Sequence, residues 1–196
     1  ESDAEYQNRK NQRAGRPDVE PLYTVADAMR VPEFLQTCEY DQTIEVCEGV
    51  KATFIDAGHL LGSASILLEL EENGEKRTIV FSGDIGNVDQ PIIRDPQFFN
   101  GADYVVMEST YGNRNHTEVW SYTDDLAAII NETLGKGGNV VIPSFAVGRT
   151  QELLYFIREI KDRHLVTSVQ DFPVYVDSPL AKSATRIFCG DLRGYL

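Results

Sequence analysis

The 196-residue sequence contains few histidines and few cysteines, with three of each. The cysteines are Cys38, Cys47 and Cys189, an odd number without C-x-x-C spacing, which argues against a disulfide framework and a cysteine-based zinc module. Free thiols in a reducing compartment are the simplest interpretation, and we expect the protein to be cytoplasmic.

Positive charge is also scarce. The chain has 18 Lys and Arg residues against 31 Asp and Glu residues, a formal net charge of −13 at pH 7. A free-standing nucleic-acid-binding domain usually presents a basic face. The balance therefore argues against such a domain, unless metal ions neutralise the site and a basic surface lies elsewhere in the protein.

The sequence has no long apolar run, no secretory signal and no initiator Met, since it begins Glu1-Ser2-Asp3. Because no apolar run approaches the roughly 18 residues of a membrane span, we expect no membrane partner. We expect the true N-terminus of the protein to be missing from this sequence, so the absent signal carries little weight.

The first half changes from polar sequence to a β pattern. Residues 1–20 lack a hydrophobic period and predict a loop or a frayed helix, and the capping box at 24–27 begins a short helix over 25–30 that Pro32 interrupts. Four strands are expected after it, and Asn73-Gly74 between the last two is a strong hairpin signal. The expected strands span 43–47, 51–56, 65–70 and 77–82.

The second half alternates strands with helices. We expect a buried strand at 103–107, helices near 122–134 and 153–160 from their apolar spacing, and further strands at 140–142 and 174–176. Such alternation predicts a parallel α/β layer, and the fold class is α/β. We place a domain boundary near Thr110, giving residues 1–110 and 111–196.

The hairpin register brings two metal-binding side chains together. If Asn73-Gly74 is a two-residue turn, Glu72 pairs with Glu75, and counting outward places Ser63 opposite Asp84. The glycine-flanked loop at 58–62 can then curl back and carry His59 toward Asp84. Imidazole and carboxylate suit zinc, iron or manganese. A turn-capping His59 and a strand-ending Asp84 remain the alternative.

Glu108 extends this pattern because it directly follows the apolar segment 104–107. If that strand runs parallel to residues 78–81, Glu108 and Asp84 lie at the same edge of the sheet, where functional groups collect in α/β folds. Glu108 is a candidate for orienting a histidine or for proton transfer. A helix N-cap or a surface carboxylate is the simpler alternative.

Two residues are candidates for substrate binding. Arg149 follows Gly148 at an expected strand-to-helix turn, where a guanidinium can contact phosphate, and an ordinary ion pair is the alternative. His116 lies shortly after Glu108 and is a candidate for lining a cleft, with a solvent-facing loop histidine as the alternative.

Five segments, taken in chain order, resemble motifs of the β-CASP branch of the metallo-β-lactamase-fold nucleases, which includes mRNA 3′-end processing endonucleases and bacterial RNA-metabolising hydrolases. The first three resemble its third metal-ligand motif, its bridging-aspartate motif and the acidic motif that opens the β-CASP domain; the last two resemble segments inside that domain. They span 54–64, 81–86, 108–112, 143–152 and 176–181.

The resemblance implies part of an αββα sandwich in residues 1–110 and the first part of a β-CASP domain in residues 111–196. It also implies an RNA-hydrolysing phosphodiesterase with two zinc ions. His59 would bind one zinc, Asp84 would bridge both, and Glu108 would pair with a histidine that acts on the substrate. The family's H-x-H-x-D-H motif and two late histidine motifs are absent from this sequence, so the remaining ligands would come from elsewhere in the parent protein.

RNA is therefore the expected partner, with DNA as an alternative and a homodimer left open. Two other functions remain on the same fold. One is a catalytically inactive scaffold subunit of an RNA-processing complex, although such subunits tend to lose the ligands that are retained here. The other is a hydrolase of small esters or thioesters, which would lack the inserted α/β segment after Glu108.

Overall fold

The computed structural model describes residues 1–115 and 121–190. The chain divides into two compact units, Glu1–Glu39 and Tyr40–Leu196. The domain boundary predicted near residue 110 falls within the second unit and stays a prediction.

The first unit is helical. Its helix α1, Ser2–Arg13, lies where the sequence predicted a loop or a frayed helix. The acidic residues in its first turn and the basic residues in its last turn complement the helix dipole, which a search for hydrophobic period overlooks. Helix α2, Val25–Arg30, begins at the predicted Thr24 capping box, and the 3-10 helix η1, Val31–Phe34, carries Pro32 at its start.

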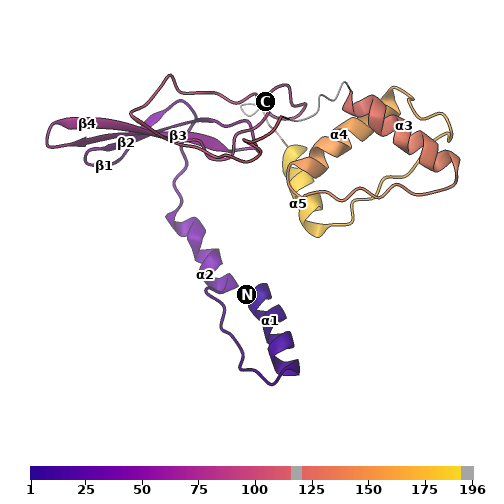
Figure 1. Ribbon diagram of the computed structural model, residues 1–196, viewed down its shortest axis with the longest axis horizontal. Helices are drawn as coiled ribbons and strands as arrows, with labels where there is room; N and C mark the ends of the chain where they lie inside the picture. The colour runs from indigo at the N-terminus through magenta and orange to yellow at the C-terminus, as the bar shows by residue number, and fades with distance from the viewer. Residues whose placement is uncertain (116–120, 191–196) are drawn as a thin grey trace. The chain divides into compact units, whose positions relative to one another are not determined.

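The second unit begins with a five-stranded sheet, most of whose strands are labelled in Figure 1, and the spatial order of the strands follows the chain. All neighbouring strands are antiparallel except β4 and β5, which are parallel. The first four strands match the predicted ones to within two residues at each end. The strands are β1 Thr43–Cys47, β2 Val50–Asp56, β3 Ala64–Glu72, β4 Glu75–Phe81 and β5 Tyr104–Val106.

The hairpin between β3 and β4 has the predicted register, with Glu72 opposite Glu75. Asn73 and Gly74 both have positive φ values, 51° and 80°, as a two-residue turn of the type I′ class requires. The register continues to the pair of Ile66 and Phe81. The hairpin turn therefore determines which residues of the two strands meet at the opposite end of the sheet.

Strand β5 forms parallel to β4 as predicted, but the expectation that it is buried is wrong. Tyr104, Val105 and Val106 are 57%, 58% and 54% exposed. The reason is that β5 lies at the edge of the sheet and, within the described ranges, pairs only with β4. An apolar run alone cannot distinguish an edge strand from a central one.

Three helices follow in residues 121–190: α3 Tyr122–Gly135, α4 Arg149–Asp162 and α5 Pro179–Phe188. Helices α3 and α4 match their predicted spacing and pack around a core of Ala127, Ile130 and Ile160. Helix α5 was not predicted. Its signal was present in the sequence, because Ser178 caps the helix and Pro179 takes its first position.

The strands predicted at 140–142 and 174–176 do not form among the described residues. A strand exists only through hydrogen bonds to a neighbouring strand, and Val141 and Tyr175 are instead 87% and 84% exposed. Both segments line one hollow of about 660 Å³ with side chains of α3 and α4. The α/β class holds, but the described parallel pairing is that of β4 with β5. Within 1–115 and 121–190, no helix has the length and apolar character to cross a membrane.

Two glycines allow close backbone contact at the end of the sheet opposite the hairpin turn. A Cβ on Gly86 would lie 1.6 Å from the Gly58 carbonyl oxygen, and one on Gly58 would lie 2.6 Å from the Pro96 nitrogen. The Gly86 N–H donates to the Ala57 carbonyl at 2.8 Å. The segments after β2 and after β4 therefore touch through their main chains, with no space for side chains between them.

The loop between β4 and β5 is attached to the end of β2 by a reciprocal pair of hydrogen bonds. The Asp56 N–H donates to the Gln97 side-chain oxygen, and the Gln97 N–H donates to the Asp56 carbonyl, both at 2.9 Å. Asp56 is buried, and its carboxylate accepts from the Gly58 N–H at 2.8 Å. These bonds hold Pro96 against Gly58.

We predict that Gly58→Ala destabilises the fold more than Gly62→Ala. Both glycines lie in one loop with positive φ, 64° and 81°, but a Cβ on Gly62 meets nothing within 4 Å. Each substitution should cost about 1–2 kcal/mol for the left-handed backbone, and Gly58→Ala should cost roughly 1–3 kcal/mol more for the clash with Pro96. Chemical denaturation measures both, and equal losses would contradict the close approach.

A second prediction concerns Asp103, whose carboxylate holds the start of β5 against β4. It accepts from the Thr78 N–H at 2.7 Å and from the Thr78 hydroxyl at 3.0 Å. The bond from the Thr78 N–H and then the bond from the Thr78 hydroxyl lower the pKa of Asp103; burial opposes them, and the charge of Arg77 adds a smaller lowering effect. A lowered pKa stabilises the fold above the ordinary carboxyl range, and that stability is lost as the pH falls through the folded-state pKa.

Asp103→Asn should therefore lower the unfolding temperature at pH 7, and its difference from wild type should shrink as the pH falls below about 4. Thermal unfolding at pH 7 and at lower pH measures this. Glu45→Gln, an exposed carboxylate on β1, is the matched control and should show no such convergence. A gap of constant size across the pH range would contradict the role of the Asp103 charge.

Candidate metal centre

His59 lies in the loop between β2 and β3, and the hydroxyl of Ser63 holds that loop in shape. The Ser63 Oγ accepts from the backbone N–H groups of His59 and Leu60, both at 3.1 Å. The Ala57 N–H donates to the Ser63 carbonyl at 3.2 Å. The loop therefore curls back on itself, as the flanking glycines allowed, and presents the His59 side chain at its outer side.

Asp84 follows β4 at the same end of the sheet. The Ser65 hydroxyl donates to the Ser82 carbonyl at 2.8 Å and so continues the register of β3 and β4 beyond the last ladder pair. The His59 Nε2 lies 3.9 Å from the Asp84 Oδ2, and the two side chains are 43% and 76% exposed. The structure thus brings together the two residues that the hairpin register predicted to converge.

Glu108 lies beside this pair, just after β5. Its Oε1 accepts from the Ile85 N–H at 2.6 Å, and its own N–H donates to the Ser82 Oγ at 3.0 Å. The bond from Ile85 is the main cause that lowers the pKa of Glu108; a bond from the Thr110 side chain and the charge of His59 add to it, and burial opposes it. Glu108 is therefore an ionised hydrogen-bond acceptor near neutral pH, and it holds the residue that follows Asp84.

The donor chemistry of His59 and Asp84 fits a metal ion. A neutral imidazole nitrogen and a carboxylate oxygen are both good ligands for zinc, and both side chains are accessible. A zinc site usually has four ligands, and no cluster of three or more His, Cys, Asp or Glu side chains suited to a metal occurs in 1–115 and 121–190. His59 and Asp84 are therefore a pair of candidate ligands, fewer than such a site requires.

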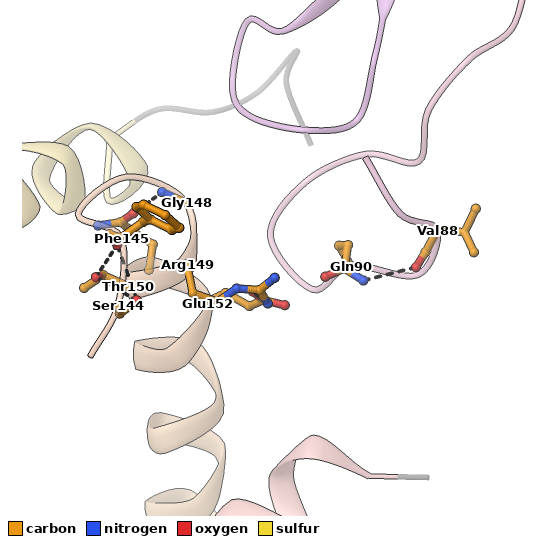
Figure 2. A network of polar contacts seen from close by, with 9 residues as sticks. Val88, Gln90, Ser144, Phe145, Gly148, Arg149, Thr150 and Glu152 are labelled. Atoms are coloured by element: carbon orange, nitrogen blue, oxygen red, sulfur yellow. Dashed lines mark hydrogen bonds and ion pairs between the residues drawn. The ribbon is translucent and has the colours of Figure 1, made fainter. Parts of the chain in front are cut away.

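Arg149 is the first residue of α4, and its guanidinium pairs with Glu152 in the next turn (Figure 2). The side chains of Arg149 and Glu152 are 62% and 12% exposed. Thr150 turns to the other side, where its hydroxyl donates to the Phe145 carbonyl at 2.7 Å. The structure thus shows the ion pair that was the alternative for Arg149, and a phosphate contact stays a prediction. His116 lies outside the described residues.

Sequence reasoning missed the residues that shape the two loops, namely Ser63, Ser82, Asp56 and Gln97. Each of them bonds to a backbone group of a loop that carries a candidate ligand or of a segment packed against such a loop. Ser63 and Ser82 lie inside the segments that resemble family motifs. Nothing in residue type or spacing shows that a serine hydroxyl will accept an amide proton from the neighbouring loop.

Comparison with known proteins gives the same family. Residues 150–193 match the Beta-Casp domain. The chain is 36% identical over 162 residues to a ribonuclease of Thermus thermophilus. The aligned region covers 83% of this chain and 35% of that protein. It is 33% identical to the endoribonuclease YSH1 of Yarrowia lipolytica over 85% of this chain and 20% of that protein.

A plant relative is also similar. The cleavage and polyadenylation specificity factor subunit 3-I of Arabidopsis thaliana is 31% identical over 85% of this chain and 22% of its own length. The chain thus spans about a third or less of the length of these curated relatives. By its domain match and by these relatives, the chain is similar to β-CASP proteins and to named ribonucleases.

Proposed function

We propose that the whole protein hydrolyses phosphodiester bonds of RNA at a zinc site to which this chain contributes His59 and Asp84. The observation that carries the proposal is the convergence of these two side chains. The His59 Nε2 and the Asp84 Oδ2 lie 3.9 Å apart, at the end of the sheet where Glu108 also lies. RNA is favoured over DNA because the similar proteins bear the names of ribonucleases and endoribonucleases.

Electrostatics support a metal-dependent reaction. Asp84 and Glu108 place two carboxylates at one end of the sheet, in a chain with a net charge of −13. Carboxylates repel a phosphodiester. Bound cations reverse the local charge of such a site. When bound, the metal ions supply a water nucleophile at neutral pH and stabilise charge on the attacking and leaving oxygens.

The residues of this chain take distinct parts in the proposal. His59 and Asp84 hold metal, and their exposure leaves them open to it. Glu108 orients the segment after Asp84 through the Ile85 N–H, and its lowered pKa keeps it an acceptor. Arg149 contacts a substrate phosphate after exchanging its partner Glu152, which a guanidinium on the exposed side of a helix start can do.

We also propose the division of the chain at residue 110. Residues 1–110 would belong to the metal-binding sandwich, since the five strands and both candidate ligands lie there. Residues 111–196 would belong to the β-CASP part, since the match at 150–193 falls within them.

Asp84→Asn should reduce RNA cleavage by the whole protein more than about a hundredfold, because changes behind a metal ligand alone cost 10–100-fold. The amide is nearly isosteric with the carboxylate, so the unfolding temperature should not change. Cleavage of a labelled RNA under single-turnover conditions measures the loss. Asp89→Asn, in the same loop at a φ of 57° that Asn tolerates, should cleave at the wild-type rate. Wild-type cleavage by Asp84→Asn would overturn the proposal.

Metal content provides a test that does not depend on activity. Elemental analysis of the whole protein should find about two zinc ions per chain in the wild type, as in two-metal sites of this kind, and fewer in His59→Asn. His164→Asn, two residues after the last residue of α4, is the matched control and should keep the wild-type content. Equal zinc in all three proteins, or none in the wild type, would contradict the role of His59 as a ligand.

A further inference from the structure

Ser82 is a buried residue between the end of β4 and Asp84, and it joins three neighbouring strands. It is 5% exposed. Its N–H donates to the Val106 carbonyl at 3.0 Å, and its carbonyl accepts from the Ser65 hydroxyl at 2.8 Å. Its own hydroxyl accepts from the Glu108 N–H at 3.0 Å. Ser82 therefore bonds to β5 on one side and to β3 on the other, beyond the last ladder pairs of β3 with β4 and of β4 with β5.

Hydrogen bonds to Glu108 hold the main chain on both sides of Asp84. Ser82 holds the backbone of Glu108, and the Glu108 carboxylate accepts from the Ile85 N–H at 2.6 Å. The chain from Ser82 to Ile85 is thus attached at both ends to the same residue, with Asp84 between the attachments. The Ser82 Oγ also donates to the Gly83 carbonyl at 2.7 Å, so its one proton is used within the segment.

We propose that Ser82 is the positioning residue for Asp84 and acts through Glu108. Its hydroxyl sets the place of the Glu108 backbone, Glu108 sets the place of the Ile85 amide, and the intervening carboxylate of Asp84 is held toward His59. Because Ser82 is buried, its proposed part is to hold the backbone behind Asp84. The catalytic consequence of this assignment rests on the proposed function, whereas the geometric consequence does not.

The same pair of strands contains a matched control. At the opposite end of β4, the Thr78 hydroxyl accepts from the Asp103 N–H at 2.9 Å, which is the same kind of bond from β4 to the start of β5. Thr78→Ala and Ser82→Ala each remove one hydroxyl that receives an amide proton from the neighbouring segment. Only the bond of Ser82 lies next to the candidate ligands.

A conservative substitution at position 82 can keep the hydrogen bond. Ser82 lines a cavity of about 190 Å³ together with Ile85 and Phe98. This space can receive the additional methyl group of Ser82→Thr, which keeps the hydroxyl. Ser82→Thr therefore separates the effect of the hydroxyl group from the effect of side-chain size at position 82.

The experiment compares wild type, Ser82→Ala, Ser82→Thr and Thr78→Ala in the whole protein. Amide hydrogen exchange of the metal-free protein reports the order of residues 83–88, with helix α3 as an internal measure of folding. Exchange at 83–88 should rise at least tenfold in Ser82→Ala and stay at the wild-type rate in Thr78→Ala. Steady-state cleavage of a labelled RNA should show kcat about 10–100-fold lower in Ser82→Ala with KM unchanged, as for other residues behind metal ligands.

Ser82→Thr should recover both readouts to within about threefold of wild type, as expected when a hydrogen-bond partner is restored. Unchanged exchange at 83–88 in Ser82→Ala would overturn the positioning role, whatever the activity. Raised exchange with normal kcat would overturn its catalytic consequence. A wild-type protein that cleaves no RNA would defeat the proposed function, while the exchange result would still decide whether Ser82 orders Asp84.

Discussion

The arrangement of the candidate site depends on the contact between two segments of the main chain, one after β2 and one after β4. The backbone of Gly86 approaches the carbonyl of Gly58 so closely that a Cβ would lie 1.6 Å from its oxygen, and the Gly86 N–H donates to Ala57. Because no side chain separates the two segments, their orientation is set by peptide groups rather than by flexible contacts. His59 and Asp84 are each within two residues of this contact, which explains how two exposed side chains come to face each other.

The loops that carry these residues contain no regular secondary structure, so their amides need other partners. Side chains provide them: Ser63 accepts from His59 and Leu60, and Glu108 accepts from Ile85. No buried side-chain nitrogen or oxygen in the described ranges lacks a hydrogen-bond partner. The polar groups that shape the loops are thus satisfied within the protein, and the imidazole and the Asp84 carboxylate remain accessible for a ligand. This division between supporting and accessible groups is typical of sites that bind metal.

Features that depend on local sequence were predictable, and features that depend on distant partners were less so. The β3–β4 register followed from Asn73-Gly74 because both residues accept the positive φ of a tight turn. The exposure of β5 was not predictable, because burial depends on what covers a strand. The expected strands at 140–142 and 174–176 did not form because no strand in the described residues pairs with them. Helix α5 was missed although its N-cap serine and first-turn proline are local signals.

For the candidate site, the sequence by itself determined that His59, Asp84 and Glu108 approach one another, as the structure shows. Strand alternation, one turn and one parallel pairing suffice to bring three strand ends to one edge. The tertiary structure alone decided how these residues are held. The roles of Ser63 and Ser82 arise from hydrogen bonds to backbone amides across a loop or between strands, and Arg149 pairs with Glu152 rather than standing free. Such bonds depend on distances of about 3 Å between atoms, and residue spacing along a chain does not specify distances of that kind.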